Sequence, residues 1–413
     1  MVEILAQTEK YDAVEVAVGK AVYPIYIGDV LEKLTEFVGN SKYSSVMVLT
    51  DSNLVKAGHL KTVLDALKKS GKKNSHGILR AGEQFKHKKY YSDMIDAVDE
   101  VELDRKTLLV ALGGGVIGDE VGFVAATYLR GVDLLQMPTT PLSGADSSIG
   151  GKVGLDTDKG KNRIGDTKQP IAVFQHTPFY QSLKDPPIKH YGYDSGWAET
   201  VKHAGIDDGL HPQLGTQEKF IDYLEKNLEG LISFDEKVIR HCMLRNAIIK
   251  GNIVEIDEKE SGMRVGLNFG HTFGHAFETF MNRILLERDP SGATVYPHGD
   301  AVGVGVHYAA WLSLLKGAGL TKSQLNRQLD IYQRLEIKTK LPKEAQDTFE
   351  EIYSFMSADK KAISGMPQFV LQERLGQLQK TGDAQPDGSE AKGGYYLQPI
   401  EREVLKKAFE MIK

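Results

Sequence analysis

An alternation of short apolar strands and amphipathic helices over residues 45–137 is the feature that most limits how this chain can fold. Strand patterns lie at 45–50, 77–80, 107–112 and 132–137. They alternate with helix patterns at 54–70, in the segment that ends at about 101, and at 120–129. Such units form a parallel sheet covered by helices on both faces. Ahead of them, residues 13–28 predict two strands joined at Gly19-Lys20, followed by a helix over 27–38. The sequence therefore predicts an α/β N-terminal domain with a Rossmann-like sheet.

The strand pattern fades beyond Thr177, and amphipathic helices follow from Trp197 to about Ile337. A chain of 413 residues exceeds the size at which one core keeps growing, so two domains are expected. We place them at 1–186 and 187–413, with the boundary near Pro186-Pro187 and an all-α second domain. Residues 381–394 are rich in turn formers and predict a mobile loop or linker before a last helix over 401–412.

Composition excludes several classes of function. A net charge of -5 and a pI near 6.2 give no electrostatic footprint for nucleic acid. No stretch is apolar enough to span a membrane, and the N-terminus has no secretory pattern. The single cysteine, Cys242, cannot form an intramolecular disulfide. We therefore expect a cytoplasmic protein that acts on small molecules.

The strand at 107–112 runs directly into a glycine-rich turn at 113–119, and a helix pattern follows. Glycines at a strand-to-helix junction let backbone N–H groups approach a phosphate, and the helix N-terminus adds partial positive charge. A plain tight turn is the alternative, because the G-x-G-x-x-G fingerprint is absent from its usual first position. The sheet context favours nucleotide binding.

Hydroxyl groups, glycines and single charges are concentrated in residues 138–154. Asp146 and Lys152 lie in this segment, Arg130 precedes it, and Lys161 and Asn162 follow it. Each charge alone is typical of a solvated surface. Their concentration in a glycine-rich segment predicts an anion-binding pocket, because buried polar groups need partners.

A histidine-rich stretch, Leu267-Asn-Phe-Gly-His-Thr-Phe-Gly-His-Ala-Phe-Glu278, sets His271 and His275 four residues apart. On a helix these two side chains and Glu278 share one face. Polar clusters at His298-Gly-Asp300 and at Glu199-Thr-Val-Lys-His203 could join them in holding a divalent metal. Imidazole and carboxylate ligands with an open position are typical of a catalytic divalent metal, although ordinary buried histidines are the alternative. Gly270 and Gly274 are costly in a helix and suggest that backbone approaches a ligand there.

Taken together, these motifs resemble the 3-dehydroquinate synthase family of the sugar phosphate cyclases over nearly the whole chain. The most specific are Ala111-Leu-Gly-Gly-Gly-Val-Ile-Gly-Asp119, Asp146-Ser-Ser-Ile-Gly-Gly-Lys152, Gly160-Lys-Asn162, Asp257-Glu-Lys-Glu-Ser-Gly262 and the histidine stretch. The resemblance implies a lyase of the shikimate pathway that uses NAD and zinc or cobalt. Its substrate would be 3-deoxy-D-arabino-heptulosonate 7-phosphate, and its products 3-dehydroquinate and phosphate.

The resemblance also implies a role for each matching residue. Metal ligands would be Glu199, His271 and His298. NAD would contact Asp51, Glu83, Lys86, Gly114, Gly115, Asp119, Thr139, Thr140 and Lys161. Substrate would contact Arg130, Asp146, Lys152, Asn162, Lys202, Lys250, Arg264, Asn268, His275 and Lys360. Glu260 and His275 are the candidates for proton transfer, with Lys152 and Asn162 beside them as catalytic residues. Arg130 would reach the substrate of a neighbouring subunit, which implies a homodimer.

Four places depart from the family's pattern: Val153, the run 141–144, the segment 164–170 and Asp300, which stands where Glu is common. None removes an implied ligand, so they bear on substrate choice. Alternatives are another cyclase, of the 2-deoxy-scyllo-inosose or 2-epi-5-epi-valiolone synthase type, and a metal-dependent dehydrogenase of glycerol-dehydrogenase type. A catalytically inactive nucleotide-binding regulator is a third, which the full set of metal and lysine positions disfavours.

Overall fold

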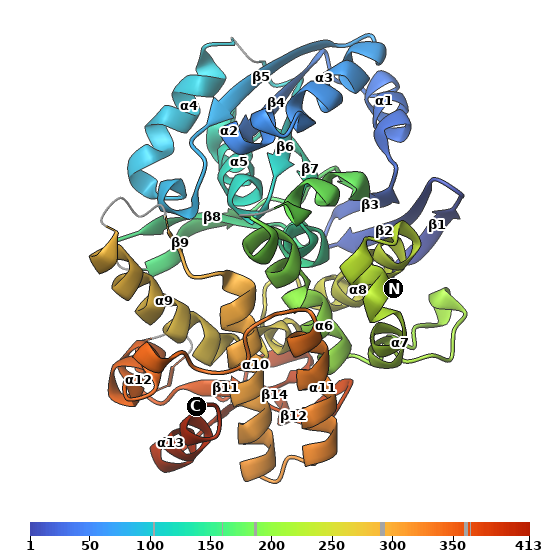
Figure 1. Cartoon of the computed structure of the whole chain (residues 1–413). Coiled ribbons are helices and arrows are strands. Elements are labelled where there is room, and N and C mark those ends of the chain that lie inside the picture. The colour runs from blue at the N-terminus through green and yellow to red at the C-terminus, as the bar shows by residue number, and fades with distance from the viewer. Residues whose placement is uncertain (102–103, 159, 186–187, 290–293, 359–361, 364) are drawn as a thin grey trace. The chain divides into compact units, whose positions relative to one another are not determined.

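The computed structural model describes residues 1–101, 104–158, 160–185, 188–289, 294–358, 362–363 and 365–413, and its chain divides into two compact units (Figure 1). The first unit is Met1–Tyr193 with Glu236–Gly251, and the second is Asp194–Asp235 with Asn252–Lys413. The expected boundary at Pro186-Pro187 lies outside the described residues. Helix α8 (Glu236–Ile256) is shared, because its residues up to Gly251 belong to the first unit. A Cβ on Gly251 would lie 2.5 Å from Cγ2 of Val2, so this helix packs directly on the N-terminal strands.

The first unit is built on a sheet that, within the described residues, has eight strands in the order β1-β2-β3-β10-β7-β6-β4-β5. Their bounds are β1 Glu3–Gln7, β2 Tyr11–Val18, β3 Ala21–Gly28, β4 Ser45–Asp51, β5 Lys73–Leu79, β6 Thr107–Gly113, β7 Asp133–Pro138 and β10 Ala172–His176. From β3 to β5 neighbouring strands are parallel, as predicted, whereas β1 and β2 add an antiparallel edge. The sequence did not reveal β1, because its side chains are all exposed or half-buried and form no apolar run.

Helices cover both faces of this sheet. Val46 and Val48 of β4 pack in one core with α1 (Leu31–Gly39) and α3 (His59–Lys69), while Met47 and Leu49 pack in another with α4 (Tyr91–Asp99) and α5 (Gly115–Thr127). Alternate residues of one strand thus enter different cores, as a doubly covered sheet requires.

Two connections differ from the sequence expectation. The helix expected over 54–70 is broken into α2 (Ser52–Lys56) and α3, because Gly58 adopts a left-handed φ of 80° between them. The polar segment after β7 forms a short π-helix, η4 (Ser143–Ser147), and then an antiparallel hairpin of β8 (Lys152–Thr157) and β9 (Gly160–Thr167).

The second unit is mainly helical, as predicted. Its helices are α6 Ala198–Ile206, α7 Phe220–Ser233, α9 His271–Arg288, α10 His298–Leu315, α11 Lys322–Arg334, α12 Phe349–Ser357 and α13 Arg402–Glu410. Helices α9, α10, α12 and α13 enclose an aromatic core that includes Phe273, Tyr308 and Phe409. No helix among the described residues is long and apolar enough to cross a membrane.

The expectation of an all-α second domain needs a correction, because short strands lie between α12 and α13. They pair as β11 (Gln368–Val370) with β16 (Leu397–Pro399), β12 (Gln372–Arg374) with β13 (Gln377–Leu378), and β14 (Gly382–Ala384) with β15 (Glu390–Tyr395). The segment 381–394, expected to be a mobile loop, therefore forms a hairpin. Its turn closes where Gln385 N–H donates to the Ser389 carbonyl at 2.9 Å.

Candidate active site

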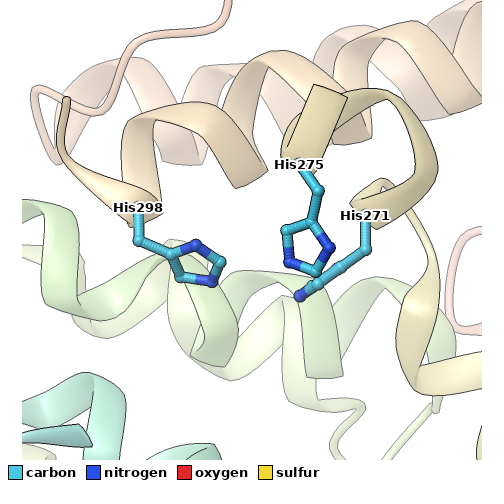
Figure 2. A group of neighbouring side chains, drawn as sticks. All are labelled: His271, His275 and His298. Atoms are coloured by element: carbon cyan, nitrogen blue, oxygen red, sulfur yellow. The ribbon is translucent and has the colours of Figure 1, made fainter. Parts of the chain in front are cut away.

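Three histidines from two helices converge in the second unit (Figure 2). His271 begins α9, His275 follows one turn later, and His298 begins α10. One ring nitrogen from each lies within 4.8 Å of the others. The spacing of four residues puts His271 and His275 on one helix face, as the sequence predicted. His298 joins them from a different helix.

Close packing of α9 against α10 brings these rings together. A Cβ added to Gly305 would lie 2.1 Å from the carbonyl oxygen of Gly270, and one on Gly274 would lie 2.9 Å from that of Ala301. These glycines let two backbones approach each other. Gly270 and Gly274 therefore serve helix packing, which corrects the idea that they make room for a ligand.

Hydrogen bonds fix the tautomers of two of the rings. Nδ1 of His271 lies 3.1 Å from the Phe269 carbonyl oxygen, and Nδ1 of His298 lies 3.0 Å from Oε2 of Glu278. Both partners only accept, so each Nδ1 carries the proton and donates it. In the neutral ring, Nε2 then presents a lone pair, as in a metal-binding histidine.

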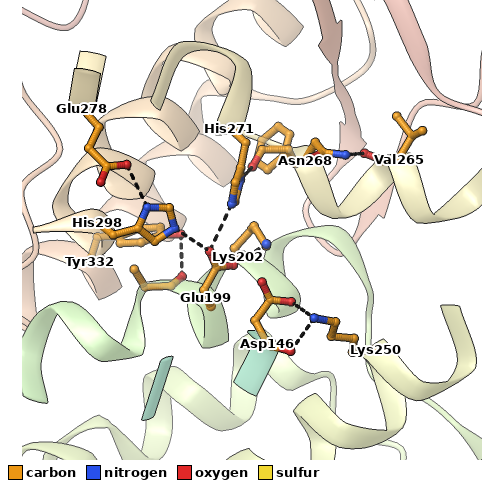
Figure 3. A network of polar contacts seen from close by, with 12 residues as sticks. Asp146, Glu199, Lys202, Lys250, Val265, Asn268, His271, Glu278, His298 and Tyr332 are labelled. Atoms are coloured by element: carbon orange, nitrogen blue, oxygen red, sulfur yellow. Dashed lines mark hydrogen bonds and ion pairs between the residues drawn. The ribbon is translucent and has the colours of Figure 1, made fainter. Parts of the chain in front are cut away.

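Glu199 of α6 faces both of these Nε2 atoms (Figure 3). Its Oε1 lies 3.2 Å from Nε2 of His271 and 3.7 Å from Nε2 of His298, and its Oε2 forms an ion pair with Lys202. Among the described residues, neither oxygen of this fully buried carboxylate accepts a hydrogen bond of regular geometry. A buried carboxylate and ring nitrogens that converge in this way need either protons or a metal cation to balance them.

Without a metal, protons and Lys202 balance this charge. Burial raises the pKa of Glu199, but Lys202 and His271 outweigh burial and hold that pKa well below its usual range. Burial lowers the pKa of His298, but Glu278 and Glu199 reverse this and raise it to about 10. A divalent cation would take the place of the proton on His298, since ligands bind metal in their deprotonated form. One carboxylate and two or three imidazoles suit a divalent transition metal.

A tight turn over 257–268 holds three further predicted residues, Glu260, Arg264 and Asn268. The Asp257 carboxylate caps the turn by accepting from the backbone N–H groups of Ser261, Gly262 and Arg264 at 2.7–3.1 Å. Arg264 is buried and donates to the Glu258 carbonyl at 2.6 Å. Asn268 donates to Oε1 of Glu260 at 2.6 Å, so this turn brings the two side chains together.

In the first unit the glycine turn lies where the sequence placed it. Strand β6 ends at Gly113, Gly114 is the N-cap, and α5 begins at Gly115. Asp119, one turn into α5, pairs with the buried Lys86 at 2.5 Å. Burial lowers the pKa of Lys86, but Asp119, Glu83 and Asp156 reverse this effect and raise it. The fold thus gathers acidic and basic groups at the open end of the turn.

Other predicted cofactor residues surround the same turn or act locally. Lys161 pairs with Glu83 at 3.0 Å, and the Thr139 N–H donates to the Gly113 carbonyl at 3.0 Å. Thr140 lies close to the turn, because a Cβ on Gly114 would be 3.2 Å from its Cγ2. Asp51 caps α2 by accepting from the Asn53 N–H at 2.7 Å.

Residues predicted to bind substrate in the first unit fall into two groups. Lys250 of α8 forms an ion pair with Asp146, which Figure 3 also draws. Lys152 and Asn162 are exposed on the β8–β9 hairpin, and the Asn162 N–H donates to Asp156 at 2.6 Å. Arg130 is exposed in the short helix η3 (Tyr128–Arg130) with a left-handed φ of 66°. Lys360 lies outside the described residues.

Sequence reasoning missed the partner of one buried carboxylate and the burial of another. Glu278 was seen on the face of His271 and His275, but its partner is His298, twenty residues away on another helix. Glu120 of α5 is buried, and neither of its oxygens has a hydrogen-bond partner among the described residues. A charged residue inside an otherwise apolar stretch was the available signal for Glu120.

Solved structures identify the fold as that of sugar phosphate cyclases. A crystal structure of 2-deoxy-scyllo-inosose synthase matches with a TM-score of 0.75 at 20% identity, covering 97% of this chain and 99% of that chain. The 2-epi-5-epi-valiolone synthase of Streptomyces hygroscopicus subsp. jinggangensis 5008, with NAD+ and Zn2+ bound, matches with a TM-score of 0.74 at 20% identity. The match covers 96% of this chain and 98% of that chain. A probable glycerol dehydrogenase from Sinorhizobium meliloti 1021 is more distant, with a TM-score of 0.58 at 13% identity, covering 93% of this chain and 94% of that chain.

Sequence comparison narrows this class to one family. The model of the 3-dehydroquinate synthase N-terminal domain matches residues 76–190, and that of the C-terminal domain matches 196–362. The 3-dehydroquinate synthase of Desulforamulus reducens is 35% identical over 368 residues, covering 88% of this chain and 94% of the relative. That of Pseudomonas aeruginosa is 36% identical over 368 residues, covering 89% and 92%. The chain belongs to the 3-dehydroquinate synthase family.

Proposed function

We propose that this chain converts 3-deoxy-D-arabino-heptulosonate 7-phosphate to 3-dehydroquinate and phosphate, the shikimate-pathway reaction of its family. NAD and zinc or cobalt are the proposed cofactors. The observation that carries the proposal is the convergence of Glu199 Oε1 with Nε2 of His271 and His298, whose Nδ1 protons are already engaged. Relatives with the same name cover most of the chain, which supports this reaction over others of the class.

The metal would be held by Glu199, His271 and His298. When bound, a divalent metal supplies Lewis acidity that favours the ionised form of a substrate hydroxyl. His275 also has a ring nitrogen within the cluster. We assign it to substrate binding and proton transfer, together with Glu260.

NAD would lie along the glycine turn, and its chemistry is to take a hydride from a secondary alcohol and later return it. The N–H groups at the start of α5 are suited to the pyrophosphate. The proposed contacts are Asp51, Glu83, Lys86, Gly114, Gly115, Asp119, Thr139, Thr140 and Lys161.

The remaining proposed residues bind the two anionic ends of the substrate, its phosphate and its carboxylate. Basic and amide side chains orient these groups and neutralise their charge, which lowers the cost of expelling phosphate. The phosphate itself can accept the proton that is removed during elimination. The proposed set is Arg130, Asp146, Lys152, Asn162, Lys202, Lys250, Arg264, Asn268, His275 and Lys360.

Cofactor stoichiometry provides the test. Purified protein is incubated with the heptulosonate phosphate, zinc and substoichiometric NAD, while phosphate, 3-dehydroquinate and reduced nicotinamide are followed. We expect many turnovers per NAD and no build-up of reduced cofactor, because the hydride is returned. Reduced cofactor in proportion to product would indicate a dehydrogenase, and turnover of only a hexose or other heptulose phosphate would indicate another cyclase.

We also propose a cytoplasmic homodimer. The single cysteine, which is free and buried, fits a reducing compartment, and the role that the resemblance implies for Arg130 fits a dimer. Size measurement in solution tests the dimer.

A further inference from the structure

The hairpin of β14 and β15 lies in a part of the chain that the family model does not match, since that match ends at residue 362. The hairpin is closed at its base where the Thr381 N–H donates to the Tyr395 carbonyl at 2.8 Å. Residues 386–390 at its tip are all exposed. Its return strand, β15, contains the buried Ala391.

The return strand packs directly on the 257–268 turn. A Cβ on Gly262 would lie 2.4 Å from the carbonyl oxygen of Lys392 and 2.6 Å from the carbonyl carbon of Ala391. One on Gly393 would lie 2.8 Å from Cβ of Met263. Backbone thus meets backbone here with no space for a side chain. The hairpin and the turn can move apart only by losing this contact.

The turn needs such support because its conformation is costly. Glu260 is not a glycine, yet it adopts a left-handed φ of 60°. Residues in sparsely populated backbone regions cost roughly 1–3 kcal/mol each and persist where the surroundings fix them. Asp257 fixes the turn from inside through its bonds to the N–H groups of Gly262 and Arg264. The hairpin contacts the same turn at Gly262 through the backbone of Ala391 and Lys392.

We propose that the β14–β15 hairpin is a positioning element for the substrate-binding turn, and that its backbone contact with Gly262 holds Glu260, Arg264 and Asn268 in their mutual arrangement. The inference rests on the proposed function for the roles of these three residues. The contact itself is independent of that function. No hairpin residue needs to touch the substrate.

Two changes test the contact. In the first, residues 383–394 are replaced by Asn-Gly, which closes a two-residue hairpin on the paired Gly382 and Tyr395. In the second, Gly262→Ala is made in the full chain and in the shortened chain. Gly382→Ala is the matched control, because Gly382 lies in the same hairpin and an added Cβ would meet its nearest atom, the Ala384 carbonyl oxygen, at an ordinary 3.7 Å.

Hydrogen exchange of the 257–268 amides, measured on the substrate-free protein, is the first readout. We expect faster exchange at 261–264 in the shortened chain and in the Gly262→Ala chain, and an exchange rate equal to that of the wild type in the Gly382→Ala control. In the shortened chain, Gly262→Ala should have no further effect, because the backbone that it meets is gone. Unchanged exchange, or an equal effect of Gly262→Ala in both backgrounds, overturns the proposal.

Steady-state kinetics is the second readout. Both changes should raise KM for the heptulosonate phosphate and lower kcat/KM by roughly tenfold to a hundredfold, as expected when binding groups are misplaced. Zinc affinity should stay as in the wild type, which separates positioning from general unfolding. Wild-type protein without synthase activity would refute the proposed function, and exchange would still decide the role of the hairpin. If the shortened chain does not fold, the comparison of Gly262→Ala with Gly382→Ala decides the role of the hairpin.

Discussion

At the scale of single residues, Glu278 controls how His298 presents its Nε2. The Glu278 side chain is buried and accepts from Nδ1 of His298 at 3.0 Å. A charged acceptor there orients the ring and increases its basicity, and loss of such a partner typically costs about tenfold to a hundredfold in metal affinity. We expect Glu278→Gln to weaken zinc binding by about that factor, measured by competition with a chromophoric chelator.

The control for Glu278 is the same substitution elsewhere in the second unit. Glu225→Gln removes a carboxylate that pairs with Arg327 at 2.5 Å and that, among the described residues, has its hydrogen bonds and ion pairs with Arg327. It should leave zinc affinity unchanged. Equal affinity in Glu278→Gln and wild-type protein would show that His298 is oriented without Glu278 or is not a ligand.

Glu120 should make stability depend on pH. Burial raises its pKa to about 8, despite the opposing effect of Lys86. The folded protein therefore binds this proton more tightly than the unfolded chain, whose pKa is near the usual 4.5. The stability that this bound proton contributes is complete below pH 4.5 and is lost as the pH rises through about 8.

Glu120→Gln removes this titration. The difference in unfolding free energy between variant and wild type should grow in favour of the variant, by on the order of a few kcal/mol, when the pH is raised from about 5 to about 9. Urea unfolding at both pH values measures the difference. The control Glu390→Gln, at an exposed position of β15, should show the same pH dependence of unfolding free energy as the wild type. If Glu120→Gln also shows the wild-type pH dependence, Glu120 is ionised in the folded protein.

At the scale of elements, the glycine contact between α9 and α10 sets the distance between the histidines. A methyl group at Gly305 would collide with the backbone of Gly270, so Gly305→Ala must push the helices apart or distort one of them. Overpacking of this kind costs roughly 1–3 kcal/mol. We expect a lower melting temperature together with weaker zinc binding, measured by calorimetry and chelator competition.

A glycine with more space provides the comparison for Gly305. In Gly382→Ala the nearest atom, the Ala384 carbonyl oxygen, would be 3.7 Å away. Melting temperature and zinc affinity should both remain close to wild type. A Gly305→Ala protein that melts lower yet binds zinc normally would show that the histidines tolerate movement of α10.

Local pattern predicted the elements whose signal is contained in their own residues. The parallel strands, the glycine turn before α5 and the pair His271 and His275 are such cases, because periodicity and spacing determine them. Contacts between distant segments could not be predicted in this way. The bond from His298 to Glu278 and the contact of Gly262 with the 382–395 hairpin depend on tertiary packing. The sequence offered the polar clusters at Glu199 and His298 as possible partners of the histidine pair. Their assignment with His271 as the metal ligands came from the family resemblance and remains a prediction.

At the scale of the whole molecule, the position of Arg130 concerns assembly. Leu129 and Arg130 adopt left-handed φ values of 50° and 66°, and both side chains are exposed. Two successive non-glycine residues in this region are uncommon and are held by their surroundings. Arg130 is thus exposed in the first unit. Its role in the substrate site of another subunit remains a prediction.

Subunit mixing tests that role. Arg130→Ala and Lys152→Ala should each be inactive alone, because each removes a positive charge from the proposed phosphate site. If Arg130 acts in the partner's site, a mixed dimer contains one site with both groups and one site with neither. Random mixing should then restore roughly a quarter of wild-type activity, since half of the dimers are mixed and each has one complete site. Mixed dimers are isolated with two different affinity tags and assayed for phosphate release. Isolated mixed dimers without activity would place Arg130 in the site of its own subunit, because each site would then lack one of the two groups.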